Sequence, residues 1–333
     1  MLIYAGIDEA GYGPMFGPLL VSRAVFALRG VEPADDPAQP PPNLWKTLRK
    51  AVCRRVSQGK SRLVVNDSKK VYTPAQGIRR LELGVLSFAA LAGVRPATVD
   101  QWLDAVGETC HRKLDGLPWY EPTDAHPWGA LPAGCTAGEA AVARNALFSA
   151  ANRVGFQVLD LGAAVVLEDR FNRMVAATRS KAAASFTFVA AHLTAIWDRF
   201  GQHGPYVVVD RQSGRTYYRE LLATTFPGAR LSILDENDAS SAYGIDQPSG
   251  GRRMTVRFEV DADARHMPVA LASMCAKYTR ELFMARFRAW FTRRVPHIKP
   301  TAGYATDAKR FWREIEPELA GLAIDAQRLR RMC

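Results

Sequence analysis

The sequence predicts an α/β protein built on a mixed central β-sheet. Two apolar runs near the amino terminus, separated by a short glycine-rich segment, are typical of a hairpin. Further β-like runs then alternate with helical patterns along the rest of the chain. Hydrophobic residues make up 48% of the 333 residues and charged residues 23%, the composition of a folded globular protein. This length allows one large domain or two smaller ones.

Strands are expected where apolar, β-prone residues run together between turn signals. The predicted strands are Leu2–Ile7, Leu19–Leu28, Phe156–Leu167, Tyr206–Asp210, Arg230–Asp235 and Met254–Val260. The first two flank the glycine-rich segment Gly11–Gly17 and should pair antiparallel, whereas strands separated by helices favour parallel pairing. The sheet is therefore expected to be mixed.

Helices are expected where apolar residues recur at helical spacing. The predicted helices are Asn43–Val56, Pro74–Leu91 with Thr73 as N-cap, Ala137–Val154, Phe171–Phe200 and Val269–Phe291. Two proline-rich stretches without periodicity, Val31–Pro42 and Val106–Cys135, are expected to be a surface excursion and an insertion. Within the insertion we expect Trp119, Tyr120 and Trp128 to form a lid packed on the body, with a stacking platform for a nucleic-acid strand as the alternative.

Charge and cysteine content narrow the class of protein. Lys and Arg number 44 against 33 Asp and Glu, a net charge of +11 that favours a polyanionic partner, nucleic acid first. An uninformative basic composition is the alternative. From Lys277 to Cys333 the balance is 13 cations minus 6 anions, or +7. No apolar run reaches the roughly 18 residues of a membrane span, so no membrane partner is expected.

The five cysteines are scattered and never form a CxxC pair, which indicates a reducing, cytoplasmic location and gives no support to a disulfide framework. A zinc site is only weakly suggested, because the spacing of its four candidate ligands fits no standard zinc finger. Those candidates are Cys110, His111, His126 and Cys135.

Carboxylates stand where buried strands are expected to end. Asp8 and Glu9 follow the first strand, Asp210 closes another, and Asp261 and Asp263 follow the last. Gathered carboxylates repel one another, and a divalent cation with a preference for hard oxygen ligands, Mg²⁺ or Mn²⁺, is the usual remedy. Two such ions would activate a water molecule and stabilise the leaving oxygen of a phosphodiester. The alternative for each carboxylate is a helix N-cap or a turn ligand.

Four blocks of sequence resemble, in order, the type 2 ribonucleases H, the ribonuclease HII and HIII group. They are Gly6–Leu19 (GIDEAGYGPMFGPL), Asn66–Lys70 (NDSKK), Ala272–Arg280 (ASMCAKYTR) and Gly303–Thr306 (GYAT). The first block is the most specific. The resemblance implies a ribonuclease H-like fold, a central mixed sheet flanked by helices with insertions and a helical C-terminal region. It also implies a two-metal endonuclease that cuts the RNA strand of RNA/DNA hybrids and leaves 5′-phosphomonoesters.

The resemblance also assigns roles to individual residues. It implies four metal-binding, catalytic carboxylates, which are Asp8, Glu9, Asp210 and Asp263. Asp263 is selected because it lies ten residues before Ser273, and Asp261 is the alternative. The substrate-binding residues are expected to be Gly11, Tyr12, Gly13, Lys69, Lys70, Ser273, Lys277 and Tyr304. Lysines would pair with phosphates, and the Tyr304 ring would stack beside the 2′-hydroxyl unless it is a core aromatic.

The expected cofactors are two Mg²⁺ or Mn²⁺ ions, the expected partner is an RNA/DNA hybrid, and the expected assembly is a monomer. We expect a catalytic domain over residues 1–290, with the insertion near 106–135, and a basic C-terminal helical extension over residues 291–333 packed on it.

One block departs from the family pattern. Where ribonuclease HII usually has Gly-Arg-Gly, this chain has Gly11-Tyr12-Gly13. The glycine backbone can still approach a ribose, but Tyr12 offers a hydroxyl and a stacking face in place of a cationic fork. Recognition of a single embedded ribonucleotide is therefore not implied. Two other functions stay open: a non-cleaving protein that binds hybrids or junctions, and a nuclease of this fold with a different nucleic-acid substrate.

Overall fold

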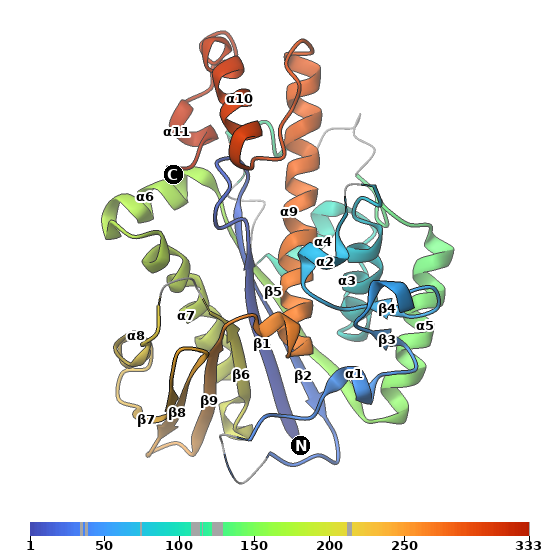
Figure 1. Cartoon of the computed structure of the whole chain (residues 1–333), viewed down its shortest axis with the longest axis vertical. Coiled ribbons are helices and arrows are strands. Elements are labelled where there is room, and N and C mark those ends of the chain that lie inside the picture. Colours follow the sequence, from blue (N-terminus) through green and yellow to red (C-terminus); the bar gives the residue numbers. More distant parts are fainter. Residues whose placement is uncertain are drawn as a thin grey trace.

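The computed structural model contains a seven-stranded mixed sheet with helices on both faces (Figure 1). The structure describes residues 1–33, 36, 39–73, 75–107, 114, 116–121, 129–211 and 215–332. The strands of the sheet are β1 (Leu2–Ala10), β2 (Leu19–Leu28), β5 (Phe156–Val166), β6 (Tyr206–Asp210), β7 (Arg230–Glu236), β8 (Ser240–Gln247) and β9 (Arg252–Glu259). Their order across the sheet is β5-β2-β1-β6-β9-β8-β7.

The pairing of the strands is both antiparallel and parallel, as expected. β1 and β2 form the predicted antiparallel hairpin, and β5 pairs antiparallel with β2. β6 pairs parallel with both β1 and β9. The sequence patterns missed β8, which pairs antiparallel with β7 and β9 and completes the edge of the sheet. The predicted fold class, a mixed central sheet flanked by helices with a helical C-terminal region, is confirmed.

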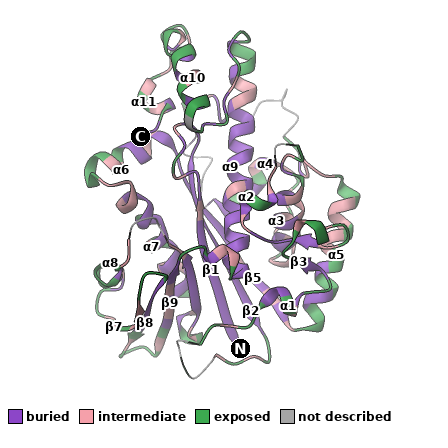
Figure 2. Cartoon of the chain, in the orientation of Figure 1, coloured by how far each residue is buried: buried purple, intermediate pink, exposed green. Residues whose placement is uncertain are grey.

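Helices cover the two faces of the sheet and bury a separate apolar core on each side, so the strands are largely buried, except for the edge strand β7 (Figure 2). They are α1 (Leu44–Thr47), α2 (Ser68–Val71), α3 (Arg79–Leu91), α4 (Val99–Val106), α5 (Ala137–Arg153), α6 (Glu168–Thr178), α7 (Lys181–Phe200), α8 (Arg219–Thr225), α9 (Met267–Arg294), α10 (Ala305–Ile315) and α11 (Ala326–Leu329).

The long helix α9 packs against β1 at unusually short range. A Cβ atom on Gly6 would lie only 2.2 Å from the backbone nitrogen of Val269, so no side chain fits at Gly6. This close approach sets the first turns of α9 directly against β1, two residues before its carboxylate pair. The sequence block that begins at Gly6 is thus explained partly by packing.

Three predicted helices differ from the structure. The helix expected over Asn43–Val56 is the single turn α1, after which β3 (Val52–Cys53) pairs in parallel with β4 (Leu63–Val64). A pairing partner eleven residues away overrides the helical spacing there. The helix expected from Pro74 begins at Arg79 without Thr73 as its cap. The helix expected over 171–200 is two helices, because Arg179 at the end of α6 adopts a left-handed conformation with φ of 52°.

The insertion near residues 106–135 packs on the body where the structure describes it. Trp119 and Tyr120 are buried, with the Trp119 ring centroid 6.5 Å from that of Phe291 and the Tyr120 ring centroid 5.1 Å from that of Phe283. A packed lid is therefore confirmed for these two residues. Trp128, Cys110, His111 and His126 lie outside the described residues, and so does any test of the suggested zinc site.

Two further expectations concern organisation. The boundary expected between residues 290 and 291 falls inside α9, which continues to Arg294, and the division into a catalytic domain and an extension stays a prediction. Within the described part of the chain, none of the helices is long and apolar enough to cross a membrane.

Candidate active site

Two of the four predicted carboxylates, Asp8 and Asp210, are neighbours at the carboxyl ends of adjacent strands. β1 and β6 run parallel with Ile7 paired to Val209, so Asp8 and Asp210 follow side by side. Only 7% of the Asp8 surface is exposed, and Asp210 is half-buried. The carboxyl ends of parallel strands are where ligands bind in open α/β sheets, because the connections open a crevice there.

The third strand brings a further carboxylate to the same edge. β9 lies beside β6 with Asp210 paired to Glu259, and the chain then turns toward α9. The Asp210 carboxylate accepts a hydrogen bond of 2.8 Å from the backbone nitrogen of Ala262, and this bond holds the turn that carries Asp263. Asp261, the alternative fourth carboxylate, adopts a left-handed conformation with φ of 52° at the start of that turn.

Electrostatics link these carboxylates into one group. Burial raises the pKa of Asp8 well above its usual range, and the charges of Asp210, Glu9 and Asp263 raise it further. Burial also raises the pKa of Asp210 to about 6, with Asp263 and then Asp261 contributing repulsion. Burial raises the pKa of Asp263 to about 6 as well. The charge of Asp263 contributes to the repulsion felt by Asp8, which favours Asp263 as the fourth member.

The donor chemistry of this group fits a divalent cation. All four side chains offer hard oxygen ligands, and the fold opposes ionisation of three of them, a cost that a bound cation would offset. Across the described part of the chain, however, no three Asp, Glu, His or Cys side chains are drawn close enough together to hold an ion as they stand. One Asp8 oxygen instead accepts a hydrogen bond of 2.6 Å from the backbone nitrogen of Glu9.

Ser273 joins the carboxylates to the second sequence block. A hydrogen bond with Ser273 lowers the pKa of Asp8, against the larger effect of burial. Its Oγ also lies 3.1 Å from the Oγ of Ser68, at the start of α2. Asp67 caps α2 by accepting a hydrogen bond from the backbone nitrogen of Lys69. The Asp67 charge raises the pKa of Asp263, which places Asp67 at the border of the site.

The two lysines of α2 face this acidic group. Lys69 and Lys70 are exposed, and their charges oppose the rise in the pKa of Asp263. The Nζ of Lys70 lies 3.8 Å from a carboxylate oxygen of Asp67. Exposed ammonium groups beside a carboxylate cluster are suited to bind the phosphates of a substrate that the carboxylates would otherwise repel.

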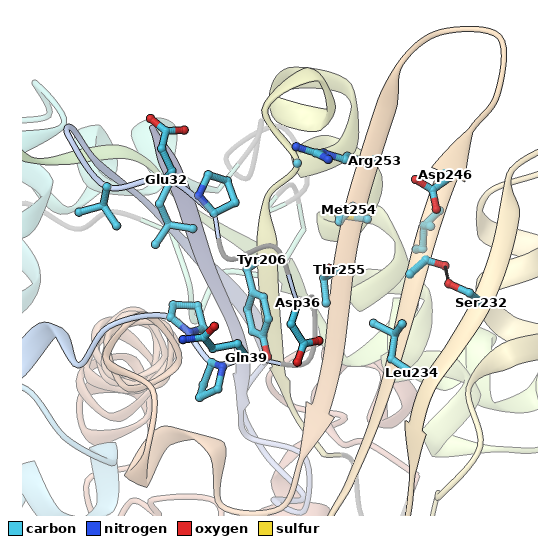
Figure 3. Close-up of a pocket in the computed structure, with 18 of the residues that line it drawn as sticks. Glu32, Asp36, Gln39, Tyr206, Ser232, Leu234, Asp246, Arg253, Met254 and Thr255 are labelled. Carbon is cyan, nitrogen blue, oxygen red and sulfur yellow. Dashed lines mark hydrogen bonds between the residues drawn. The ribbon is translucent and has the colours of Figure 1, made fainter.

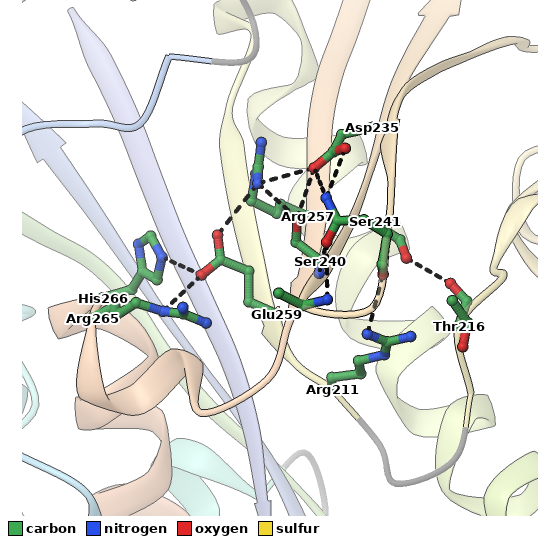
Figure 4. Close-up of polar contacts among 11 residues, drawn as sticks. Arg211, Thr216, Asp235, Ser240, Ser241, Arg257, Glu259, Arg265 and His266 are labelled. Carbon is green, nitrogen blue, oxygen red and sulfur yellow. Dashed lines mark hydrogen bonds and ion pairs between the residues drawn. The ribbon is translucent and has the colours of Figure 1, made fainter.

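A polar network ties the start of α9 to the sheet (Figure 4). The Glu259 carboxylate on β9 lies 3.0 Å from the Nε2 of His266 and 3.1 Å from the Nε of Arg265. Across the sheet, the hydroxyl of Tyr4 lies 2.5 Å from the Nδ1 of His266. Because His266 is the residue before α9, this network fixes the helix that carries Ser273.

The glycine-rich turn between β1 and β2 has one glycine that the fold requires and one that it does not. Gly11 has φ of +84°, and a Cβ there would lie 2.7 Å from the carbonyl oxygen of Pro18. Gly13 is exposed, and a Cβ there would meet nothing within 4 Å. Tyr12 is half-buried, and burial raises its pKa, followed by the charge of Glu9. The open space at Gly13 leaves room for a substrate backbone.

Buried side chains hold this turn from beneath. The Gly17 nitrogen donates a hydrogen bond of 3.0 Å to the carboxylate of Glu168 on α6. The Phe16 carbonyl accepts a hydrogen bond of 2.8 Å from the guanidinium of Arg280, a residue of α9 that is fully buried. Arg331, near the carboxyl terminus, donates its backbone nitrogen to the carbonyl of Met15 at 2.9 Å and its guanidinium to the carbonyl of Pro14. Three distant segments therefore determine the shape of the turn.

Two further predicted residues, Lys277 on α9 and Tyr304 before α10, lie beside each other. The Nζ of Lys277 forms an ion pair of 2.8 Å with Glu281 and lies 5.5 Å from the ring centroid of Tyr304. The Arg280 guanidinium lies 4.8 Å from the same ring. Tyr304 is 41% exposed, so the alternative of a core aromatic is wrong, and its ring rests on two cations. Lys277 is 13% exposed and closely paired, whereas Lys70 is 58% exposed and lies 3.8 Å from its partner Asp67, so Lys277 is less free to bind phosphate.

A hollow of about 930 Å³ lies at the opposite end of the sheet (Figure 3). It is lined by the start of β1, by Tyr206 at the start of β6 and by Arg253–Thr255 at the start of β9, with the proline-rich excursion as its other wall. These are the amino ends of the parallel strands. The hollow is therefore separate from the carboxylate group.

Sequence patterns missed several residues that shape the site. Asp67 and Ser68 lie inside the second sequence block, and their position next to Lys69 could have identified them as site residues. Glu168 and Arg331 carry no local signal, because each meets the glycine-rich turn from more than 150 positions away along the chain, the Gly17–Glu168 contact being 151 residues apart.

Comparisons with known proteins return similar solved structures, whereas no family model and no curated protein matches. One is ribonuclease HII of Archaeoglobus fulgidus, in a complex with PCNA, at 17% identity and a TM-score of 0.41 over 99% of this chain and 92% of that chain. Another is ribonuclease H2 of Pyrococcus horikoshii, at 14% identity and 0.40 over 98% and 92%. A third is Bst-RNase HIII with Mn²⁺, at 16% identity and 0.40 over 99% and 66%. All belong to the group that the four sequence blocks resemble.

Proposed function

We propose that this protein is a metal-dependent endonuclease that hydrolyses the RNA strand of RNA/DNA hybrids. The single observation that supports this most is the pairing of Asp8 and Asp210 at the ends of adjacent parallel strands, with Glu9 and Asp263 close enough to shift the pKa of Asp8. A protein that only binds nucleic acid gains nothing from gathered acids, which repel phosphates. The resemblance of the four sequence blocks supplies the substrate class.

In the proposed reaction, Asp8, Glu9, Asp210 and Asp263 would hold two Mg²⁺ or Mn²⁺ ions. When bound, the ions supply activation of a water molecule and stabilisation of the departing 3′ oxygen. The 5′-phosphomonoester stays on the other product. No histidine or serine nucleophile is needed, because water is the nucleophile and the side chains of the protein position the substrate.

Positioning falls to the residues around the carboxylates. Lys69 and Lys70 bind backbone phosphates, and Ser273 holds Asp8. The exposed Tyr304 ring, supported by Lys277 and Arg280, stacks on a sugar or base beside the 2′-hydroxyl.

On the other side of the proposed cleft, the open backbone at Gly13 lets the turn approach the ribose. Gly11 keeps the turn in shape, and Tyr12 supplies a ring and a hydroxyl where the family pattern has a cation.

The test is cleavage of a labelled RNA/DNA hybrid, with Mg²⁺ or Mn²⁺, by the wild type and by Asp8→Asn. The proposal expects cleavage of the RNA strand by the wild type and none by Asp8→Asn, with hybrid binding kept by both. Binding without cleavage by the wild type, at any concentration of either metal, would instead support a hybrid-binding protein.

Substrate choice is tested by comparing three substrates: a uniform hybrid, a duplex with one embedded ribonucleotide, and a four-way junction. Preference for the junction would move the assignment to a nuclease of the same fold with another substrate. The monomeric state and the cytoplasmic location stay predictions.

A further inference from the structure

A second concentration of positive charge lies outside the C-terminal region. The segment over residues 43–66, which we call the basic module, contains α1, β3 and β4 and has no Asp or Glu. Its cations are Lys46, Arg49, Lys50, Arg54, Arg55, Lys60 and Arg62. Seven cations minus no anions give this short segment a charge of +7, equal to that of residues 277–333.

These cations are exposed and lack acidic partners. Six of the seven are exposed and Arg62 is half-buried. None of them forms an ion pair with another residue that the structure describes, although Lys and Arg elsewhere in the chain do. Crowding like charges without counter-ions is unfavourable, and a polyanionic ligand relieves the repulsion by releasing its own counter-ions.

Five of the cations line one shallow groove. This groove of about 590 Å³ is bordered by Lys46, Arg49, Arg54, Arg55 and Arg62, and its inner wall includes Trp45 and Asn66. The Arg54 guanidinium lies 5.6 Å from the centroid of the Trp45 ring, whose nitrogen donates a hydrogen bond to the carbonyl of Val65. Arg54 is thereby held in place at the groove, with less conformational entropy to lose when it binds.

The groove lies next to the candidate active site along the chain. Asn66, at its inner end, donates a hydrogen bond of 3.0 Å to the carbonyl of Arg54. The next residue is Asp67, whose charge acts on Asp263. Arg62 is five residues from Asp67, so the chain between them spans at most about 18 Å. At 3.4 Å per base pair, this length corresponds to about five base pairs of duplex.

We propose that the groove of the basic module binds the sugar-phosphate backbone of the duplex substrate within about five base pairs of the candidate active site. The proposal rests on the proposed function and extends its footprint along one side of the active site (Figure 1, where β3 and β4 lie beyond α2 from α9). The apolar side chains of the groove, Trp45, Val52 and Cys53, are buried, so the surface offered to a partner is cationic and polar. Phosphate contacts of this kind position a duplex without reading its sequence.

The test variant is Arg49→Gln/Arg55→Gln. Both side chains are exposed, and neither forms a hydrogen bond or an ion pair with a residue that the structure describes, so the fold should be unchanged. The matched control is Arg219→Gln/Arg230→Gln, which removes two exposed arginines from α8 and β7 on the other side of the sheet. Binding to a hybrid of about 24 base pairs is measured without divalent metal between about 50 and 200 mM salt.

The expected result is a shallower salt dependence for Arg49→Gln/Arg55→Gln. Its log-log slope should fall by about 1.8, because each lost phosphate contact removes about 0.9. The control should keep the wild-type slope. Hybrid and DNA duplexes of equal length should lose affinity equally, because only phosphates are contacted.

Two outcomes would overturn the proposal. If the wild type cleaves hybrids and Arg49→Gln/Arg55→Gln keeps the wild-type salt slope on the long hybrid, the groove does not bind the substrate. The proposed function is then unaffected. If the wild type neither binds nor cleaves any hybrid, both the groove proposal and the proposed function are wrong.

Discussion

The two ends of the central sheet differ in shape and in charge. The amino ends of the strands border the hollow of about 930 Å³, where Glu32 pairs with the terminal amine and Asp246 is exposed. The carboxyl ends gather Asp8, Asp210 and Asp263, whose ionisation the fold opposes. A protein keeps such unfavourable charges where they serve a function, so the cost of ionisation locates the candidate site better than cavity volume does.

The largest effect should come from removing one charge at each end. Asp210→Asn should lower hybrid cleavage by at least about 1,000-fold, because metal-assisted catalysis contributes several kcal/mol. Asp246→Asn, the matched change at the amino ends, should cleave like the wild type. The measurement is kcat/KM on a labelled hybrid. Equal losses in both variants would erase the distinction between the two ends.

A pH effect should follow from Glu168, beneath the glycine-rich turn. Burial raises the pKa of Glu168 to about 7 in the folded protein, whereas the unfolded chain should titrate near the ordinary value of about 4.3. A raised pKa favours the folded state at low pH, so this contribution is fully present below the unfolded pKa and is lost as pH rises through about 7. The total is roughly 4 kcal/mol.

Chemical denaturation of the wild type and Glu168→Gln between pH 5 and pH 8 measures this contribution. The wild type should lose stability relative to the variant as pH rises, because glutamine keeps an acceptor for the Gly17 nitrogen without a charge. Parallel curves over this range would show that Glu168 ionises normally.

Divalent cations should stabilise the carboxyl end alone. At a cation concentration about 100 times its dissociation constant, binding adds about 2.7 kcal/mol to the free energy of unfolding, and Tm rises. The rise should occur in the wild type and in Asp246→Asn, and it should shrink in Asp8→Asn. Thermal melts with Mg²⁺, Mn²⁺ or EDTA provide the measurement, and an undiminished rise in Asp8→Asn would place the ions elsewhere.

The smallest effect separates two glycines of one turn. Gly11→Ala should cost about 1 to 2 kcal/mol of stability from the left-handed backbone alone, whereas Gly13→Ala should leave stability unchanged. Gly13→Ala should nevertheless weaken hybrid cleavage, because the added methyl group occupies space meant for the substrate backbone. Melting temperature and KM measured together check both statements. Unchanged KM in Gly13→Ala would mean that the turn does not approach the ribose.

Local sequence patterns predicted the strands that are apolar along their whole length. The apolar runs of β1, β2 and β6 are buried on both faces, and their ends were found to within a few residues. β8 was missed because its sequence, SSAYGIDQ, has polar and glycine residues that become buried only when β7 and β9 flank it. Helical spacing misled over residues 43–56, where β3 and β4 pair instead.

The candidate site divides in the same way. The position of Asp210 at the end of a buried strand was predictable from the apolar run before it. A carboxylate there is costly to bury without a partner, which marked it as a candidate site residue. Asp263 needed the family resemblance, since its turn is placed by a hydrogen bond from Ala262 to Asp210. The buried supports of the glycine-rich turn, such as Arg280, could not be predicted because their partners come from distant segments.

The most direct test of the shared carboxylate site is anomalous diffraction from crystals soaked in Mn²⁺. The account predicts two manganese peaks bounded by Asp8, Glu9, Asp210 and Asp263 at the carboxyl ends of β1 and β6, and the loss of at least one peak in Asp8→Asn. Manganese bound only in other places, in crystals of a protein that cleaves hybrids, would contradict it.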